Sequence, residues 1–451
     1  MKTAPTELAS LADKDHQFLW HPFTQMKEWM LEEPLIIESG QGAILRDTAG
    51  KEYLDANSSI WTSLHGHRHP KITQAIKDQL DRIAHSSFLG LSNVPAIELA
   101  EKLVSLAQQS LHAPLSAEAS AKAERSTLHA ARPGLSRVFY SDDGSTAMEV
   151  AIKMALQYWQ HRQQPRRTKF VAFADAYHGD TLGAVSIGGI ELFHATFQPL
   201  TFDVLRVGRK EDCGKLFEQH GREIAAVVIE PLIQGAGGMK LWPRGLLSDL
   251  RRLCDESGVL LIADEVMTGF GRTGTMFACE QEQVVPDLMA VAKGLTGGYL
   301  PLAATLTTEE IFNAFLGDYA EFKTFFHGHS YSGNQLGCAA ALANLQVFEE
   351  EQTLRRVSVI GEQLSVGMER LRKLPHVVDV RCLGGIGAVE IGPYPIEQKM
   401  GIKVCSEMRK RGVLTRPLGN TIAIMPPYCI TREQLDRVLA VLAESIRTVV
   451  S

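Results

Sequence analysis

The sequence has few of the features that mark exported, membrane-bound or metal-binding proteins. Its seven cysteines are scattered, odd in number and without a C-x-x-C pair, which favours reduced thiols over a disulfide framework or structural zinc site. No apolar run is long enough to span a bilayer, and the opening MKTAPTELASLADKDHQF lacks the apolar core of a signal peptide. The 46 basic and 52 acidic residues form no long run of one sign, which disfavours nucleic acid or an anionic membrane as partner. We therefore expect a cytoplasmic protein that acts on small molecules.

With 451 residues, 45% of them hydrophobic, the chain can build a large domain and a smaller one. LIIESGQGAILRDTAGKEYLDANSS predicts a small β unit in which D-T-A-G-K forms a hairpin. Residues 108–134 are rich in alanine, serine and charge, which predicts a surface excursion. The apolar strands and intervening helices that follow are typical of an α/β domain, with a loop expected after the second strand: RVFY, KFVAFA, AAVVIE, VLLIA, DLMAVA and PLAATLTT.

Between Val259 and Gly298, the two apolar runs VLLIA and DLMAVA are each followed by an ionisable residue, Asp264 and Lys293 respectively. Reactive groups of open α/β sheets lie at the carboxyl ends of the strands, so both side chains are expected in one crevice. A lysine and an aspartate so placed fit pyridoxal phosphate, with the lysine as Schiff-base former and the carboxylate keeping the pyridine nitrogen protonated. On this stretch alone, two ordinary strand-end residues explain the pattern equally well.

Two other features lie on the same expected rim. Ser141-Asp-Asp-Gly-Ser-Thr-Ala147 links a strand to a helix, so Gly144 and Ser145 would present backbone N–H groups at a helix N-terminus, where phosphate binds. Plain helix capping needs the same residue types. Tyr177, after KFVAFA, could stack on a planar ring, and the alternative is a tyrosine of the core. The four features together indicate a pyridoxal phosphate site more strongly than any one alone.

Three further motifs are weaker. Residues 269–274 spell G-x-G-x-x-G, but no strand directly precedes them and TMFACEQE is a poor helix opening, which disfavours a dinucleotide site. His65, His67 and His69 alternate as an extended metal site would, yet no acidic or cysteine ligand lies near them in sequence, so we expect no metal. Arg416 could grip a substrate carboxylate or form a surface salt bridge.

The motifs as a set, in chain order, resemble the fold-type I, class III aminotransferases: WHPFTQM, HGHRHP, DDGSTAMEVAIKMALQYW, YHGDT, IEPLIQGAGG, ADEVMTGFGRTG, AKGLTGG, FFHGHSYSGN and TRPLG. The resemblance covers nearly the whole chain. It implies an α/β fold with a large, mainly parallel-sheet α/β/α domain and a smaller α+β domain built from both chain ends. We expect residues 1–69 to belong to the small domain, 70–333 to form the cofactor-binding domain and 334–451 to complete the small domain.

The resemblance also implies roles for individual residues. Lys293 would hold pyridoxal phosphate and shuttle the proton, Asp264 would bind the ring nitrogen, and Tyr177 would stack on the ring. Gly144 and Ser145 would bind the phosphate. Arg416 would bind the carboxylate of the keto acid. Phe23, Ile60 and Trp61 would form the wall of the substrate pocket together with Tyr177 and Lys293. Gly328, His329 and Ser330 would reach the cofactor of the other subunit in a homodimer.

Within the class, the W-H-P-F-T-Q-M opening and MALQYW resemble the members that convert 8-amino-7-oxononanoate to 7,8-diaminononanoate in biotin synthesis by ping-pong transamination. Many of these use S-adenosylmethionine as amino donor and carry tyrosine and a second tryptophan where this chain has Phe23 and Ile60. Those two residues, with HGHS in place of H-G-P-T, resemble the branch that uses lysine. The donor therefore has two candidates.

Two other functions share the same cofactor residues. A general ω-aminotransferase acting on diamines, ornithine or 4-aminobutyrate would differ only in its pocket and would readily use 2-oxoglutarate. A silent regulator that senses pyridoxal phosphate would bind it without amino transfer, and the presence of Lys293 argues against this reading.

Overall fold

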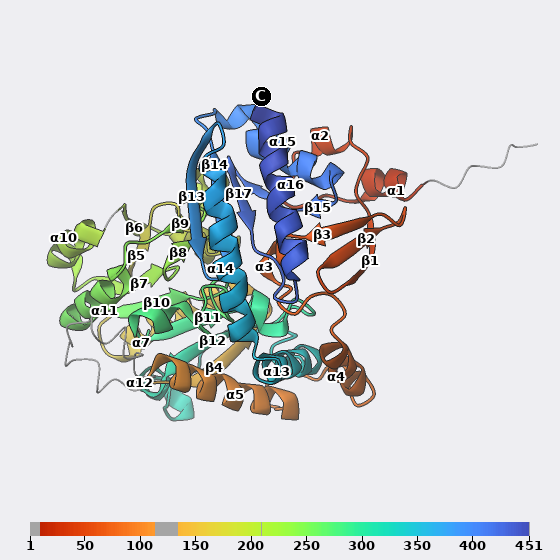
Figure 1. Ribbon diagram of the computed structural model, residues 1–451. Coiled ribbons are helices and arrows are strands. Elements are labelled where there is room, and N and C mark those ends of the chain that lie inside the picture. The colour runs from red at the N-terminus through yellow and green to blue at the C-terminus, as the bar shows by residue number, and fades with distance from the viewer. Residues whose placement is uncertain (1–9, 113–133, 209, 451) are drawn as a thin grey trace, which may run out of the picture.

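The computed structural model describes residues 10–112, 134–208 and 210–450. At its centre is a seven-stranded sheet with the order β4-β12-β11-β10-β7-β5-β6 (Figure 1). The strands from β11 to β6 are parallel, whereas β12 runs antiparallel to both β11 and β4. This confirms the predicted mainly parallel α/β fold. The strands are β4 (Leu135–Ser141), β5 (Lys169–Phe173), β6 (Val204–Val207), β7 (Ile224–Ile229), β10 (Leu260–Asp264), β11 (Leu288–Val291) and β12 (Ala303–Thr308).

Helices cover both faces of this sheet, which explains why its central strands are apolar throughout. In β10, Leu261 and Ala263 belong to one hydrophobic cluster, whereas Leu260 and Ile262 belong to another on the opposite face. The first face packs against α5 (Val94–Leu111), α11 (Leu246–Ser257) and α13 (Gln335–Glu350). The second packs against α7 (Gly144–His161), α8 (Leu182–Ile187) and α12 (Glu309–Ala314). The result is a three-layer α/β/α sandwich.

Two smaller four-stranded sheets complete the fold. The first contains β1 (Ile37–Gln41), β2 (Ile44–Asp47), β3 (Glu52–Asp55) and β15 (Val413–Leu414). Its β2–β3 hairpin is the one predicted from D-T-A-G-K, and β15 pairs in parallel with β3, so segments from both ends of the chain share one sheet. The second contains β13 (Val377–Leu383), β14 (Ile386–Ile391), β17 (Thr421–Ile424) and β16 (Pro417–Leu418).

Helix α14 (Thr353–Leu371) lies on β13 and β14, and α16 (Arg432–Val450) packs between α14 and α15 (Met400–Lys410), as Figure 1 shows. The remaining elements are short or peripheral: α1 (Leu11–Phe18), α2 (Met26–Trp29), α3 (Ser58–Trp61), α4 (Pro70–Leu80), α9 (Glu191–His194), α10 (Lys210–His220), β8 (Ile233–Gln234), β9 (Lys240–Leu241), and the 3₁₀ segments η2 (Ala195–Leu200), η3 (Ala278–Glu282), η4 (Lys293–Thr296), η5 (Tyr319–Glu321) and η6 (Ile396–Gln398).

The prediction of a loop between KFVAFA and AAVVIE is wrong, because this segment contains α8, α9, β6 and α10. Strand β6 is a four-residue edge strand whose Arg206 is exposed, so its apolar pattern is weak. The predicted excursion at 108–134 lies largely outside the described residues. The domain boundary proposed at 333/334 stays a prediction. Helix α13, which directly follows it, packs against α4 and α5, which precede it in the chain. Within the described ranges, no helix has the length and apolarity needed to cross a membrane.

Candidate active site

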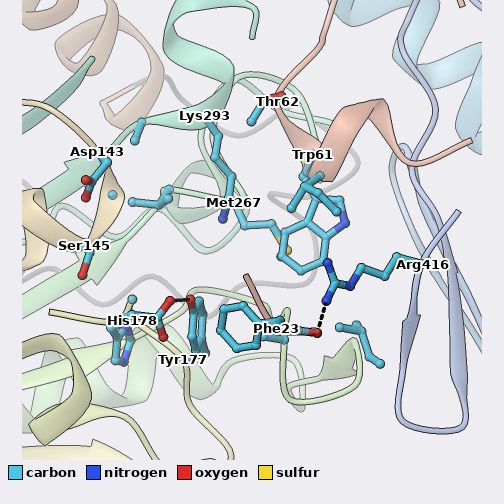
Figure 2. Close-up of a pocket in the computed structure, with 18 of the residues that line it drawn as sticks. Phe23, Trp61, Thr62, Asp143, Ser145, Tyr177, His178, Met267, Lys293 and Arg416 are labelled. Carbon is cyan, nitrogen blue, oxygen red and sulfur yellow. Dashed lines mark hydrogen bonds between the residues drawn. The ribbon is translucent and has the colours of Figure 1, made fainter. Parts of the chain in front are cut away.

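A cavity of about 1120 Å³ lies at the carboxyl ends of the central strands. It is lined by five of the seven residues predicted for the cofactor, Gly144, Ser145, Tyr177, Asp264 and Lys293, but not by His329 or Ser330. Figure 2 shows that Lys293, Ser145 and Tyr177 reach the cavity from separate segments. Asp264 and Lys293, which follow neighbouring strands, therefore lie in one cavity as the strand-end rule predicted.

Lys293 follows β11 as the first residue of η4, with a φ of 41°. Its Nζ lies 5.0 Å from the centre of the Trp61 ring. Burial lowers the pKa of the Lys293 ammonium, and this effect outweighs the opposing influence of the Asp264 and Glu230 carboxylates. A larger fraction of this lysine is consequently the neutral amine that a nucleophile or base must be.

Asp264 ends β10 and is only 5% exposed. Its Oδ2 accepts a hydrogen bond from His178 Nδ1 at 2.6 Å, and its Oδ1 accepts one from the Val266 N–H at 3.0 Å. His178 is itself buried, which leaves the carboxylate little freedom to rotate. Asp264 is thus a fixed negative charge in the cavity, and the sequence analysis overlooked the histidine that orients it.

The start of α7 borders the cavity through Gly144 and Ser145. Asp143 caps the helix by accepting the Thr146 N–H at 2.9 Å, which confirms the capping interpretation, whereas the phosphate interpretation stays a prediction. Ser145 Oγ accepts the Thr181 N–H at 2.9 Å. A Cβ at Gly144 would lie 2.5 Å from Val266 Cγ1. The glycine therefore allows the first turn of this 18-residue helix to approach the cavity wall closely.

Tyr177 is held at both its backbone and its hydroxyl. Its N–H donates to Glu230 Oε1 at 3.1 Å, and its hydroxyl donates to Asp180 Oδ2 at 2.7 Å. Burial, with the hydrogen bond to Asp180, raises the pKa of the Tyr177 hydroxyl, which keeps the ring neutral. The Phe193 ring meets Tyr177 edge-on, with centroids 6.2 Å apart. This leaves Tyr177 as a fixed aromatic wall of the cavity.

The outer wall is formed by four of the residues predicted to contact substrate: Phe23, Ile60, Trp61 and Arg416. Arg416 Nη2 donates to the Phe23 carbonyl oxygen at 3.0 Å, as the dashed line in Figure 2 shows. Trp61 is 8% exposed, whereas Ile60 and Phe23 are 44% and 54% exposed. The wall therefore has a buried aromatic base and an open, apolar mouth beside which the Arg416 guanidinium lies.

Glu230 is a cavity residue that the sequence analysis did not single out. It follows β7, is buried, and accepts N–H bonds from Tyr177 and, at 2.8 Å, from Gly235. Burial and the nearby Asp264 carboxylate raise the pKa of Glu230 to about 7. The strand AAVVIE ends on this residue, so the rule that found Asp264 also applies to it.

The other predicted residues lie elsewhere. Gly328, His329 and Ser330 do not line this cavity, and His329 Nδ1 lies 2.9 Å from Asp142 Oδ2 at its edge. Among the described residues, no group of three or more potential ligands could hold a metal ion.

The three histidines contact different residues, and two of these are acidic, although the sequence showed no acidic residue nearby. His67 pairs with Asp55, His69 pairs with Glu351, and His65 packs on Phe348. The G-x-G-x-x-G motif at 269–274 is separated from the end of β10 and is followed by the 3₁₀ segment η3, which is not dinucleotide-site geometry.

The sheet places a lysine, an aspartate and a helix N-terminus at one rim, as expected for a class III aminotransferase. The chain belongs to this family: the family model described as aminotransferase class-III matches residues 26–446. It is similar to the adenosylmethionine-8-amino-7-oxononanoate aminotransferase of Nitratidesulfovibrio vulgaris, with 50% identity over 96% of this chain and 81% of that protein. The crystal structure of the enzyme of that name from Methanocaldococcus jannaschii superimposes with a TM-score of 0.90, at 42% identity, over 97% of this chain and 99% of that one.

The enzyme is a pyridoxal-phosphate-dependent aminotransferase. An amine transaminase from an uncultivated Pseudomonas species, solved in its pyridoxal-phosphate-bound form, has a TM-score of 0.86 and 30% identity over 96% of this chain and 99% of that one. The residues of this chain fit the cofactor. The glycine-lined corner suits a phosphate, the fixed Asp264 carboxylate suits a protonated ring nitrogen, and the Lys293 amine reaches the same cavity.

Proposed function

We propose that this enzyme transfers an amino group to 8-amino-7-oxononanoate and so forms 7,8-diaminononanoate, a step of biotin synthesis. The main support is full-length similarity to enzymes whose names state this acceptor, together with a cavity that has an apolar wall and one arginine at its mouth. Such a cavity suits an acceptor with an apolar chain between its reacting carbonyl group and a terminal carboxylate.

Lys293 and Asp264 would perform the chemistry from fixed positions. Pyridoxal phosphate, when bound, supplies the carbonyl group that takes up the amino group and a protonated ring that accepts electrons. The Lys293 Nζ would remove the proton from the donor carbon and return one to the acceptor carbon. Its lowered pKa suits this role because a neutral amine can act as a base. Asp264, held by His178, would keep the proton on the ring nitrogen.

Arg416 would set the distance between the substrate carboxylate and the reacting carbon. Replacing Arg416 with leucine is expected to raise the KM for 8-amino-7-oxononanoate about 10- to 100-fold with little change in kcat, because a charge-assisted hydrogen bond is lost far from the chemistry. Steady-state kinetics with varied keto acid measure this effect. Arg432→Leu, on the exposed start of α16, is the matched control and should leave the KM unchanged.

The amino donor is either S-adenosylmethionine or lysine. The names of the relatives favour the first, whereas the wall at Phe23 and Ile60, which lacks a hydroxyl and a second indole, favours lysine slightly. Both residues lie at the mouth of the cavity, where the donor side chain would pass.

A half-reaction separates these alternatives and tests the proposed acceptor. Purified enzyme is mixed separately with 7,8-diaminononanoate, lysine and S-adenosylmethionine, and loss of the yellow absorbance of the bound cofactor is followed. We expect 7,8-diaminononanoate to bleach the enzyme, because it is the product of the proposed reaction, and only one of the other amines to do so. No response to 7,8-diaminononanoate, with ready use of 2-oxoglutarate as acceptor, would favour a general ω-aminotransferase.

We further propose a cytoplasmic homodimer in which Gly328, His329 and Ser330 reach the cofactor of the other subunit. Two observations support this arrangement: these residues do not line the cavity of their own chain, and the flanking Phe326 and Tyr331 are 74% and 61% exposed. Large exposed aromatic side chains are typical of protein interfaces.

A further inference from the structure

The segment that carries Ile60 and Trp61 is a turn of left-handed helix. Four consecutive residues from Ser58 to Trp61 have φ values of 47°, 46°, 64° and 68°. The Trp61 N–H donates to the Asn57 carbonyl at 2.8 Å and the Thr62 N–H to the Ser58 carbonyl at 2.9 Å, which closes the turn. No glycine occurs in it, and L-residues disfavour this conformation, so the surrounding structure must hold it.

Asp55 is the main anchor of this turn. Its Oδ1 accepts the Asn57 N–H at 3.2 Å and the Ser59 N–H at 3.1 Å. Its Oδ2 accepts the Ser59 hydroxyl at 2.9 Å and His67 Nε2 at 3.1 Å. Asp55 is 2% exposed; burial would raise its pKa, but the hydrogen bonds from His67 and Ser59 outweigh this and hold the pKa below its ordinary value. The group is therefore a carboxylate at neutral pH, able to accept all four bonds.

A second contact ties the turn to the C-terminal part of the chain. The Ser58 hydroxyl donates to the Met425 carbonyl at 2.6 Å, and the Met425 N–H donates to the Ala56 carbonyl at 2.8 Å. Met425 directly follows β17. The turn is therefore fixed between Asp55 on one side and the second small sheet on the other.

The left-handed conformation determines where the wall residues point. Trp61 Nε1 donates to Asn57 Oδ1 at 2.8 Å, and its ring faces the Lys293 amine. Figure 2 shows Trp61 between Lys293 and Arg416. If the turn relaxed to right-handed φ values, the Cα–Cβ directions of Ile60 and Trp61 would change and the wall would be lost. Asp55 itself does not line the cavity.

We propose that Asp55 is a positioning residue for substrate selection, which holds the left-handed turn so that Ile60 and Trp61 form the substrate wall. This inference rests on the proposed function in one respect, since contact between Trp61 and substrate is part of that proposal. It requires no particular donor or acceptor, only an amine that the enzyme accepts.

The first test compares Asp55→Asn with Asp47→Asn in the half-reaction. Asparagine can still accept N–H bonds at one oxygen, but its amide nitrogen cannot accept from Ser59 Oγ or His67. For Asp55→Asn we expect the apparent dissociation constant of 7,8-diaminononanoate to rise roughly 10- to 100-fold, with the limiting rate of bleaching changed about threefold or less.

Asp47 is a matched control. It is a buried carboxylate in the same sheet that accepts the Ala49 and Lys51 N–H groups and the Tyr53 hydroxyl, but it holds no cavity residue. Asp47→Asn should leave the dissociation constant within about twofold. Ser59→Ala removes one bond at an exposed position, so it should fold even if Asp55→Asn does not, and should raise the constant roughly threefold.

A double-mutant cycle with Trp61→Ala identifies the route of the effect. If Asp55 acts through the wall, most of the loss caused by Asp55→Asn disappears in the Trp61→Ala background. Acrylamide quenching of tryptophan emission in the cofactor-free protein gives an independent readout. Trp61 is 8% exposed, so Asp55→Asn should increase the quenchable fraction of the emission by exposing this side chain. Adding Trp61→Phe to Asp55→Asn should abolish the increase.

Three results would each overturn the inference. The losses of amine affinity caused by Asp55→Asn and Trp61→Ala could be additive, Asp47→Asn could raise the dissociation constant as much as Asp55→Asn does, or Asp55→Asn could lower only the limiting rate. The proposed function is judged separately, by the response of the unmodified enzyme to 7,8-diaminononanoate. If that response is absent, the same variants are compared with whichever amine bleaches the unmodified enzyme, so failure of one proposal does not decide the other.

Discussion

Lys293→Ala is expected to reduce amino transfer by at least about 10⁴-fold while the protein still binds pyridoxal phosphate, because the proposed mechanism makes this side chain both the amine that holds the cofactor and the base that moves the proton. The Asp264 carboxylate and the corner at Gly144, where we propose that the phosphate binds, are untouched by this change. Steady-state turnover and equilibrium dialysis with the cofactor measure the two quantities.

Two controls make this result specific. Lys240→Ala removes a lysine outside the cavity that pairs with Asp175, and should leave turnover unchanged. A small primary amine added to Lys293→Ala should restore a measurable part of the activity by supplying the missing base. Substantial activity in Lys293→Ala without added amine would contradict the assignment.

Asp264→Asn is expected to lower kcat by roughly 10²- to 10³-fold, because a neutral amide cannot keep a proton on the pyridine nitrogen and so removes a preorganised charge from the site. His178 would also lose its charged acceptor. Rapid-mixing measurement of the half-reaction should show the loss in the limiting rate and a smaller change in amine binding.

Asp287→Asn provides the comparison for this variant. Asp287 precedes β11 at the opposite end of the same sheet, where its Oδ2 accepts Arg251 Nη1 and the Leu261 N–H, both at 2.7 Å. Breaking this buried pair should lower the thermal midpoint while leaving kcat per folded molecule unchanged. Equal kcat losses in the two variants would mean that Asp264 acts on stability and not on the chemistry.

The parts of the site that follow strand ends could be predicted from sequence. A buried apolar strand is recognisable without its neighbours, and its carboxyl end is the place where α/β enzymes keep reactive groups. This reasoning found Asp264, Lys293 and Tyr177, and its application to AAVVIE would have found Glu230. Strand β6 was missed because its edge position leaves too little apolar pattern.

Contacts between remote segments could not be predicted in the same way. Arg416 meets the Phe23 carbonyl from the other end of the chain, and His67 and His69 obtain acidic partners that no local spacing indicates. The left-handed turn in DANSSIW was also hidden, since positive φ is usually signalled by glycine and here none is present. Its conformation is dictated by Asp55 and Met425, which only the fold brings together.

The parallel pairing of Val413 in β15 with Leu54 in β3 has a consequence for synthesis on the ribosome. Several hundred residues must be translated after β3 before its partner strand emerges, which at roughly 5–20 residues per second means tens of seconds. During this time the nascent chain carries an unpaired strand edge of the kind that promotes aggregation. A ribosome that stalls before β15 would therefore release a chain with its large sheet complete but that edge still exposed, a substrate for chaperones and proteases.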